Sequence, residues 1–89
     1  MKAIVTVVGK DRVGIIAAVC AKLAEFNVNV LDISQTVLQG YFTMMMVVDV
    51  SRCRVELARF CEEMEKSGKD MGLSVLVQRE DIFEAMHRL

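Results

Sequence analysis

The spacing of hydrophobic residues divides this chain into six segments, and their order constrains the fold more than any other feature. Four segments are rich in β-branched residues or alternate apolar with other residues, which is typical of strands. They cover residues 2–8, 28–38, 42–50 and 73–79. Two other stretches, residues 15–26 and the residues after Ser51, have apolar positions at the period of an amphipathic helix. The sequence therefore predicts the order β-α-β-β-α-β.

The first predicted helix carries one apolar stripe. Its members recur at i, i+3, i+4 and i+7, with Phe26 close to the same line: Ile16, Val19, Cys20 and Leu23. Asp11 is the predicted N-cap, because a carboxylate accepts hydrogen bonds from the free N–H groups of a first turn. Asn27 or Asn29 is predicted to mark the exit, since asparagine tolerates the left-handed conformation that ends helices.

The second predicted strand, residues 28–38, alternates imperfectly. Its inward side chains are predicted to be Leu31, Ile33 and Val37, and its outward ones Asp32, Ser34 and Thr36. The adjacent apolar pair Val30-Leu31 indicates either a β-bulge or a strand covered on both faces. Gln39-Gly40 is the predicted turn into the third strand.

The third predicted strand has one wholly apolar face and one mixed face. The apolar face consists of Phe42, Met44, Met46, Val48 and Val50. The other face consists of Tyr41, Thr43, Met45, Val47 and Asp49. A mixed second face on a central strand predicts partial cover, for example by a partner subunit.

The second predicted helix is capped by Ser51 and ends at Ser67-Gly68 or at Gly72. Its apolar stripe is Leu57, Phe60, Cys61 and Met64. After the last strand, Asp81 is the predicted cap of a short helical tail. The apolar edge of that tail is Ile82, Phe83, Met86 and Leu89. A helix this short needs a surface to lie on.

With right-handed crossovers, this order predicts an α+β fold, the ferredoxin-like βαββαβ two-layer sandwich. It has a four-stranded antiparallel sheet with two helices on one face, followed by a short C-terminal helix. Residues 1–89 are predicted to form a single domain, with a core over residues 2–79 and the helical tail over residues 81–89.

Composition excludes several classes of function. Eleven basic residues stand against 12 acidic ones, so the basic stripe that nucleic-acid binding requires is missing. The three cysteines show no CxxC spacing, which favours reduced thiols in a cytoplasmic protein. The apolar run at residues 3–8 is too short for a signal peptide, and no run approaches a membrane span. We therefore expect a cytoplasmic protein that binds neither nucleic acid nor membrane.

The loop Gly9–Ile15 joins the first strand to the first helix and holds two glycines and three charged residues. The free N–H groups and the positive dipole end of a helix that starts here point outward at the loop, so a small anion can bind there. The alternative is a tight strand-to-helix connection in which glycines supply unusual backbone angles. The loop by itself leaves both readings open.

The residues of this loop, Lys10-Asp11-Arg12-Val13-Gly14-Ile15, and the second-strand opening Asn27-Val28-Asn29-Val30-Leu31-Asp32-Ile33 resemble the ACT domain. The resemblance covers about residues 2–79 and is nearest to stand-alone ACT proteins, a group that includes relatives of the glycine cleavage repressor. It implies a non-catalytic regulatory domain that binds an amino acid or a similar small metabolite. It also implies a homodimer, with the ligand at the interface between two copies.

Site residues follow from the resemblance by position. Gly14 falls where the ligand or a neighbouring subunit approaches the backbone, and Asp11 and Asn29 fall where the family contacts the ligand with polar side chains. The implied ligand-binding set is Asp11, Arg12, Val13, Gly14, Ile15 and Asn29. N–H groups of Val13 to Ile15 suit a carboxylate, whereas Asp11 and the Asn29 side-chain carbonyl suit an ammonium. Helix capping by Asp11 and a solvated charge at Arg12 are the alternative roles.

The sequence does not match the catalytic or cofactor-binding motifs that we considered. Gly9 and Gly14 have the spacing of a phosphate-binding loop, but Ile15-Ile16 stand where lysine and a hydroxyl residue are required. His87 is the single histidine, and Glu84 is the only carboxylate at a metal-ligand spacing from it, which is weak support for a metal site. We therefore expect no enzyme activity, no metal site and no cofactor.

A second functional class fits the same residues. The chain can be a protein-interaction or oligomerisation module that keeps the ACT sheet but has lost the ligand, and it then acts on an unidentified protein partner. Dimer contacts through the edge of the second strand would protect that edge. Contacts through the strand faces or the tail helix remain equally open.

Overall fold

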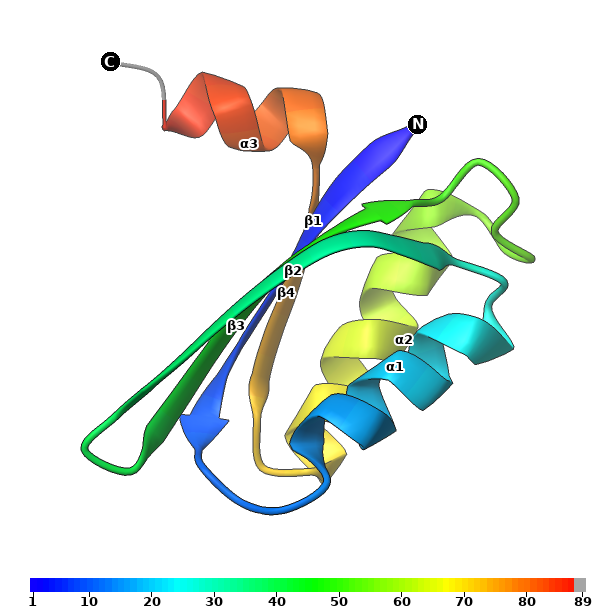
Figure 1. The fold of residues 1–89 in the computed structure, drawn as a ribbon. Helices are drawn as coiled ribbons and strands as arrows, with labels where there is room; N and C mark the ends of the chain where they lie inside the picture. Colours follow the sequence, from blue (N-terminus) through cyan, green and yellow to red (C-terminus); the bar gives the residue numbers. More distant parts are fainter. Residues whose placement is uncertain (88–89) are drawn as a thin grey trace.

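The computed structural model describes residues 1–87 and has the predicted order of elements (Figure 1). The strands are β1 (Lys2–Lys10), β2 (Asn29–Leu38), β3 (Tyr41–Asp49) and β4 (Ser74–Arg79). The helices are α1 (Ile15–Glu25), α2 (Leu57–Asp70) and α3 (Glu80–Met86). The predicted ferredoxin-like α+β fold is confirmed.

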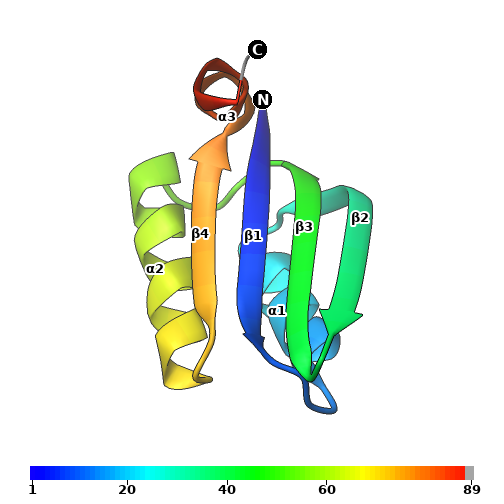
Figure 2. The same ribbon diagram turned by 90° about the vertical axis from the view of Figure 1, so that its left-hand side faces the viewer.

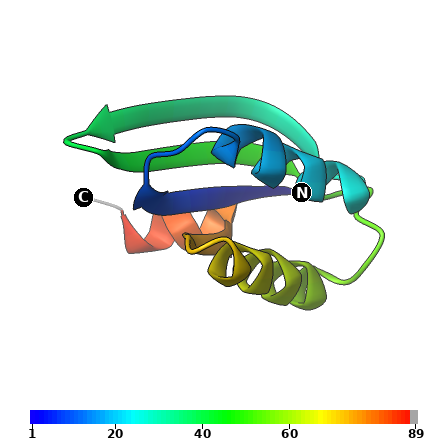
Figure 3. The same ribbon diagram turned by 90° about the horizontal axis from the view of Figure 1, so that it is seen from below.

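The sheet has four antiparallel strands in the order β2-β3-β1-β4. Helices α1 and α2 lie next to each other on one face, α1 behind β1 and β3 and α2 beside β4 (Figures 2 and 3). Helix α3 lies on the other side of the sheet, at the end where β4 stops and β1 begins (Figures 1 and 2). Most of that second face has no helix over it.

The core fills the space between the sheet and the two long helices. The predicted apolar face of β3 is confirmed, because Met44, Met46 and Val48 are fully buried and Phe42 and Val50 are almost so. Fully or nearly buried partners come from both helices: Ile15, Val19, Leu23, Phe60 and Met64. The Phe26 and Phe60 rings meet edge to face with centroids 5.5 Å apart, a favourable aromatic geometry.

Gly68 lies inside α2 and lets this helix approach β4 closely. A Cβ atom at this position would stand 2.4 Å from Cγ2 of Val75. Of the two predicted ends of this helix, Ser67-Gly68 and Gly72, the structure has the second. Gly72 has φ 74° and follows the C-cap Met71. The N–H of Leu73 closes the end on the carbonyl of Gly68 at 2.8 Å, the bond that typifies a helix end with glycine in the left-handed region.

The predicted N-caps of the second and third helices are wrong. Helix α2 begins six residues after Ser51, with the extended Glu56 at its N-cap. Ser51 instead accepts a hydrogen bond from the Met1 amine (2.6 Å) and donates its own N–H to Asp49 (2.9 Å). Asp81 is inside the first turn of α3, because β4 continues into that helix without a linker and Arg79 takes the cap position.

Strand β2 contains the predicted bulge, but its predicted inward side chains are not buried. The register with β3 shifts between Val30 and Asp32, which leaves Leu31 unpaired. Ile33 and Val37 oppose Met46 and Phe42, so they share the helix-covered face. They stay 42% and 53% exposed, because β2 is an edge strand with one flank open to solvent.

Helix α3 buries none of its residues. It contacts β1 and β4, and the Gln78 side-chain amide donates to the sulfur of Met86 over 3.2 Å. Ile82 and Met86 from the predicted apolar edge remain 45% and 64% exposed, while Leu89 lies outside the described residues. No helix within residues 1–87 has the length and apolar character to cross a membrane.

Candidate functional site

The candidate site begins where β1 leaves the sheet. Lys10, the last residue of β1, pairs with Tyr41 at the start of β3. The N–H of the next residue, Asp11, donates to the carbonyl of Gly40 over 2.7 Å. Gly40 and Gln39 both have positive φ values, 82° and 50°, which confirms the predicted tight turn. The loop is therefore fixed to the tip of the β2–β3 hairpin.

Gly14, not Asp11, caps the first helix. Gly14 has φ 92° and ψ 0°, and no side chain caps α1 among the described residues. The first helical hydrogen bond runs from the N–H of Ala18 to the carbonyl of Gly14 at 2.9 Å. The N–H groups of residues 15–17 therefore have no helical acceptor. The prediction that Asp11 is the N-cap is wrong, because the cap requires a left-handed residue and glycine meets that requirement three positions later.

A shallow hollow of about 310 Å³ lies beside this helix start. The loop, the first turn of α1, and the neighbouring parts of β2 and β3 line it. The lining residues are Asp11, Arg12, Gly14, Ile15, Ile16, Ala17, Gln35, Val37 and Phe42. The hollow therefore joins the start of the helix to the helix-facing side of the edge strand.

The lining offers three kinds of group to a small molecule. The free N–H groups and positive dipole end of α1 attract an anion. The Asp11 carboxylate and the Gln35 side-chain carbonyl can accept hydrogen bonds from a cation. Val37 and Phe42 provide an apolar wall. Hydrogen-bond donors for an anion, acceptors for a cation and a small apolar wall together match the chemistry of an amino acid.

Gln35 and Val37 were not in the predicted site. Ile33, Gln35 and Val37 alternate along β2 and therefore share one face, opposite Met46, Met44 and Phe42. A polar glutamine among residues predicted to point inward was the signal available in the sequence. Sequence alone does not single it out, because a polar residue on a strand more often lies on the solvated face.

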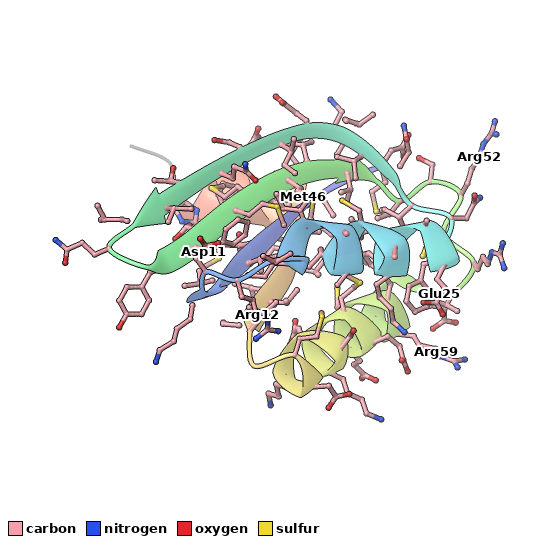
Figure 4. The ribbon with its side chains drawn as sticks, turned by 60° about the horizontal axis from the view of Figure 1, so that its bottom comes forward. Asp11, Arg12, Glu25, Met46, Arg52 and Arg59 are labelled. Atoms are coloured by element: carbon pink, nitrogen blue, oxygen red, sulfur yellow. The ribbon has the colours of Figure 1, made fainter. Side chains whose placement is uncertain are left out.

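The Arg12 side chain extends toward the end of α2 (Figure 4). Its guanidinium donates a hydrogen bond to the carbonyl of Met71, the C-cap residue of α2. A cation at this position also faces the negative end of the helix dipole. Arg12 therefore links the site loop to the α2–β4 turn. Val13, at the tip of the loop, is fully exposed and is absent from the lining.

Asn29 lies at the other end of the sheet. It pairs with Asp49, which pairs with Lys2 at the start of β1, whereas Asp11 follows the end of β1. Eight residue steps of about 3.3 Å put these two ends roughly 26 Å apart. Asn29 lines a separate polar hollow of about 400 Å³ with Asn27, Asp49 and Arg52. Within one chain, the structure brings together Asp11, Arg12, Gly14 and Ile15 but not Asn29.

The helix exit next to Asn29 follows one of the two predictions. Asn27 has φ 60° and ends the first helix, and its side-chain amide donates to the carbonyl of Arg52 at 3.0 Å. Asn29 is already the first residue of β2. The Arg52 side chain itself extends into solvent (Figure 4).

Reactive side chains elsewhere show no activated geometry within residues 1–87. No group of three or more histidine, cysteine or acidic residues there could hold a metal ion. Burial, together with nearby Glu65, raises the pKa of the Cys61 thiol, which lowers its reactivity. The His87 ring stacks on Phe83 with centroids 4.2 Å apart, and its Nδ1 lies 2.8 Å from the Phe83 carbonyl.

Comparison with known proteins gives a consistent result at the level of sequence. A family model for the ACT domain matches residues 2–78. A UPF0237 protein of Listeria monocytogenes is 49% identical over 89 residues, which cover 100% of both chains. A UPF0237 protein of Methanocaldococcus jannaschii is 48% identical over 88 residues, which cover 99% of this chain and 98% of that one.

Solved structures agree with these sequence matches. The ACT domain protein from Streptococcus pneumoniae superposes with a TM-score of 0.82 at 48% identity and covers 94% of each chain. A putative glycine cleavage system transcriptional repressor superposes with a TM-score of 0.74 at 22% identity. That match covers 88% of this chain and 44% of the repressor, and it concerns the fold alone.

Proposed function

The chain belongs to the ACT domain family, as its loop and second strand predicted, and from that premise we propose a non-catalytic regulatory domain. In this proposal it binds an amino acid or a similar small metabolite and modulates a metabolic or regulatory partner. The observation that carries the proposal is the hollow beside the start of α1, where no described side chain caps the helix and where Asp11, Gln35 and the first turn of the helix line the same space. The three free cysteines support a reducing, cytoplasmic location.

The proposed ligand is held as a zwitterion. Its carboxylate lies on the N–H groups of residues 15–17, which have no helical acceptor. Its ammonium lies between the Asp11 carboxylate and the Gln35 side-chain carbonyl, both strong acceptors for a charged donor. A small side chain then faces Val37 and Phe42. Arg12 acts as a positioning residue, because its guanidinium is bonded to Met71 and holds the loop in place.

The proposed assembly is a homodimer through β2. This strand is ten residues long, lies at the edge of the sheet and is exposed over nearly its whole length. It contains no proline and no lysine, the residues that commonly protect a free edge. Two β2 strands that pair about a two-fold axis form one continuous eight-stranded sheet. The hollow lies on the helix side of this strand, so the second copy would help to close it.

The same two-fold axis supports a role for Asn29. In an antiparallel pair of β2 strands, the Asn29 end of one copy meets the Leu38 end of the other. Leu38 leads into the Gln39-Gly40 turn, and Gly40 holds Asp11. Residues that are distant within one chain therefore approach each other between two copies. Asn29 is proposed to enter the ligand site from the second copy.

A second candidate function is an interaction module that has lost its ligand. The specific observation in its favour is Asp11, which is exposed and carries a charge that repels a ligand carboxylate. Such a module would use the sheet to bind another copy or an unidentified protein partner, with no small molecule. Ligand binding distinguishes the two functions.

The test is a thermal-shift screen of the native protein against the twenty amino acids at a fixed protein concentration. A ligand present at 100 times its dissociation constant raises the free energy of unfolding by about 2.7 kcal/mol. Asp11→Ala should remove that shift, and Asp70→Ala, which deletes another exposed carboxylate, should retain it. A ligand concentration of about 10 mM exceeds the concentrations at which typical metabolites bind. If no amino acid raises the melting temperature at up to this concentration, the sensing role is rejected and the interaction module remains.

A further inference from the structure

The uncovered face of the sheet has a centre without charged side chains. Its middle row crosses all four strands through Leu76, Thr6, Met45 and Ser34. Leu76 and Met45 are 47% and 40% exposed. Val8, in the adjacent row, is 41% exposed. Exposed apolar side chains thus lie on three neighbouring strands of a face that the two long helices do not touch.

Charge is confined to the border of this face. Among the residues that form its three middle rows, the only charged one is Asp32, on the edge strand. Lys2 and Asp49 stand at one end of the face, and Lys10 stands at the other. A neutral centre with a charged rim is the usual composition of a protein interface. A solvated sheet face of this size more often carries several charges.

Helix α3 extends the same surface. It lies against β1 and β4 on the uncovered side (Figures 1 and 2). It buries none of its own residues and exposes Ile82 and Met86. A helix of seven residues is not stable by its own hydrogen bonds, so an additional surface over α3 would stabilise it.

The size of the surface matches what a stable interface requires. Four strands about 4.8 Å apart, with six residues of about 3.3 Å each, give a footprint of roughly 20 by 20 Å. Helix α3 adds roughly 10 by 10 Å. Two copies in contact therefore bury on the order of 1,000 Å² in total, the lower bound for a specific interface.

We propose that the uncovered sheet face and α3 bind the same face of a second copy of this chain. A neutral face can oppose itself about a two-fold axis without repulsion between like charges. The apolar residues then interdigitate between two sheets about 10 Å apart, and the hydroxyl groups of Thr6 and Ser34 find partners in the opposite row. This surface is separate from the β2 edge. Used together, the two surfaces join two edge-paired dimers back to back into a tetramer.

Light scattering during size exclusion tests the proposal, because each surface has its own variant. Wild type is expected at four times the 10.0 kDa chain mass. Met45→Glu/Leu76→Glu places two charges at the centre of the face and should halve the mass to two chains. Ala58→Glu is the matched control, because it adds a charge at an exposed residue of α2, which lies on the side of the sheet opposite this face. Its mass should equal that of wild type.

The edge variant Leu31→Lys/Ile33→Lys separates this inference from the proposed edge dimer, since charged residues on an edge strand prevent pairing. It should also leave two chains. If wild type has two chains and only the edge variant becomes monomeric, the face proposal is overturned. If only the face variant becomes monomeric, the face proposal stands and the edge dimer is wrong. A protein concentration of about 100 μM exceeds the dissociation constants of typical specific interfaces. Wild type that is still monomeric at this concentration overturns both proposals.

Methionine oxidation of the wild-type protein tests the proposal even if the face variant does not fold. Hydrogen peroxide oxidises exposed methionines, and Met45 and Met1 are 40% and 64% exposed in one chain. Dilution to the monomer should speed Met45 oxidation by at least ~3-fold relative to Met1, since access controls the rate. An unchanged ratio of the two oxidation rates overturns the proposal.

Discussion

The backbone N–H of Asp11 donates to the carbonyl of Gly40, 29 residues later in the chain, over 2.7 Å. This bond ties the loop of the candidate site to the β2–β3 hairpin. On its other side, Arg12 ties the same loop to the carbonyl of Met71 at the end of α2. The site loop is therefore held between two distant turns, and its shape depends on both of them.

Gly14→Ala should destabilise the protein and weaken any binding in the hollow. No atom lies within 4 Å of the added Cβ, so the effect comes from the backbone angle of φ 92° alone. A left-handed alanine costs about 1–2 kcal/mol, which lowers the melting temperature by roughly 4–16 °C for a domain of this size. Gly14→Asn is the control, because asparagine tolerates this conformation and should lose less. Equal melting temperatures for Gly14→Ala and wild type would contradict the cap assignment.

Gly68→Ala should destabilise α2, although alanine normally stabilises a helix by about 1 kcal/mol relative to glycine. The added Cβ would stand 2.4 Å from Cγ2 and 2.9 Å from Cβ of the buried Val75. Overpacking of a core typically costs about 1–3 kcal/mol. Urea denaturation measures the net change.

Gly9→Ala provides the comparison for this variant. Its Cβ meets one close atom, Cδ2 of Leu73 at 2.5 Å, and that atom ends a side chain that can rotate. Gly9→Ala should therefore cost less than Gly68→Ala. A stabilised Gly68→Ala protein would show that α2 lies farther from β4 than the structure has it.

Arg12→Met should reduce stability modestly while keeping the length of the side chain. It removes the hydrogen bond to Met71 and a cation at the negative end of α2, which is worth about 0.3–1 kcal/mol. The difference from wild type should shrink in 1 M salt, because the dipole interaction is screened. Arg59→Met, which removes an arginine from the first turn of the same helix, is the control and should not lower stability. A loss of stability that salt does not change would argue against the charge interaction.

Asp49 should contribute to stability at neutral pH and lose that contribution in acid. Hydrogen bonds from Ser51, and then the nearby N-terminal amine, lower the pKa of this carboxyl. Because the folded pKa lies below the unfolded value, the contribution is complete above about pH 5 and falls as the pH drops through about 4 and below.

Carbon-13 NMR of the Asp49 carboxyl measures its pKa directly. Ser51→Ala removes the hydroxyl and should raise the pKa of Asp49 toward its ordinary value, while the backbone N–H of residue 51 remains. Thr43→Ala removes a hydroxyl elsewhere on the same strand and should leave the pKa of Asp49 unchanged. An Asp49 pKa that stays the same in Ser51→Ala would contradict the assigned cause.

Features that depend on neighbouring residues were predictable from sequence. The alternation of Met44 and Met46 identified the buried face of β3, and Val30-Leu31 identified the bulge. Asn27 and Gly72 were among the predicted helix ends, because few residues adopt positive φ without strain. In each case the signal and its consequence lie within a few residues of one another.

Features that depend on distant contacts were not predictable in this way. Ile33 and Val37 have the pattern of inward residues, but their exposure follows from the edge position of β2. Arg12 was assigned to the ligand, whereas its partner Met71 is 59 residues away. The Asp11 cap failed because aspartate and glycine both favour helix starts, and only the path of the loop decides between them.

The central claim is that an amino acid binds beside the start of α1, and an NMR titration tests it most directly. In nitrogen-15 spectra, the amino acid selected by the thermal-shift screen should shift the backbone amides of residues 13–17 together with Gln35 and Val37. In the proposed edge dimer, the amide of Asn29 should shift as well. Saturable shifts at these residues, lost in Asp11→Ala and retained in Asp70→Ala, are the expected result. Unchanged spectra at about 10 mM of each amino acid, or shifts confined to Arg52 or to α3, would contradict the account.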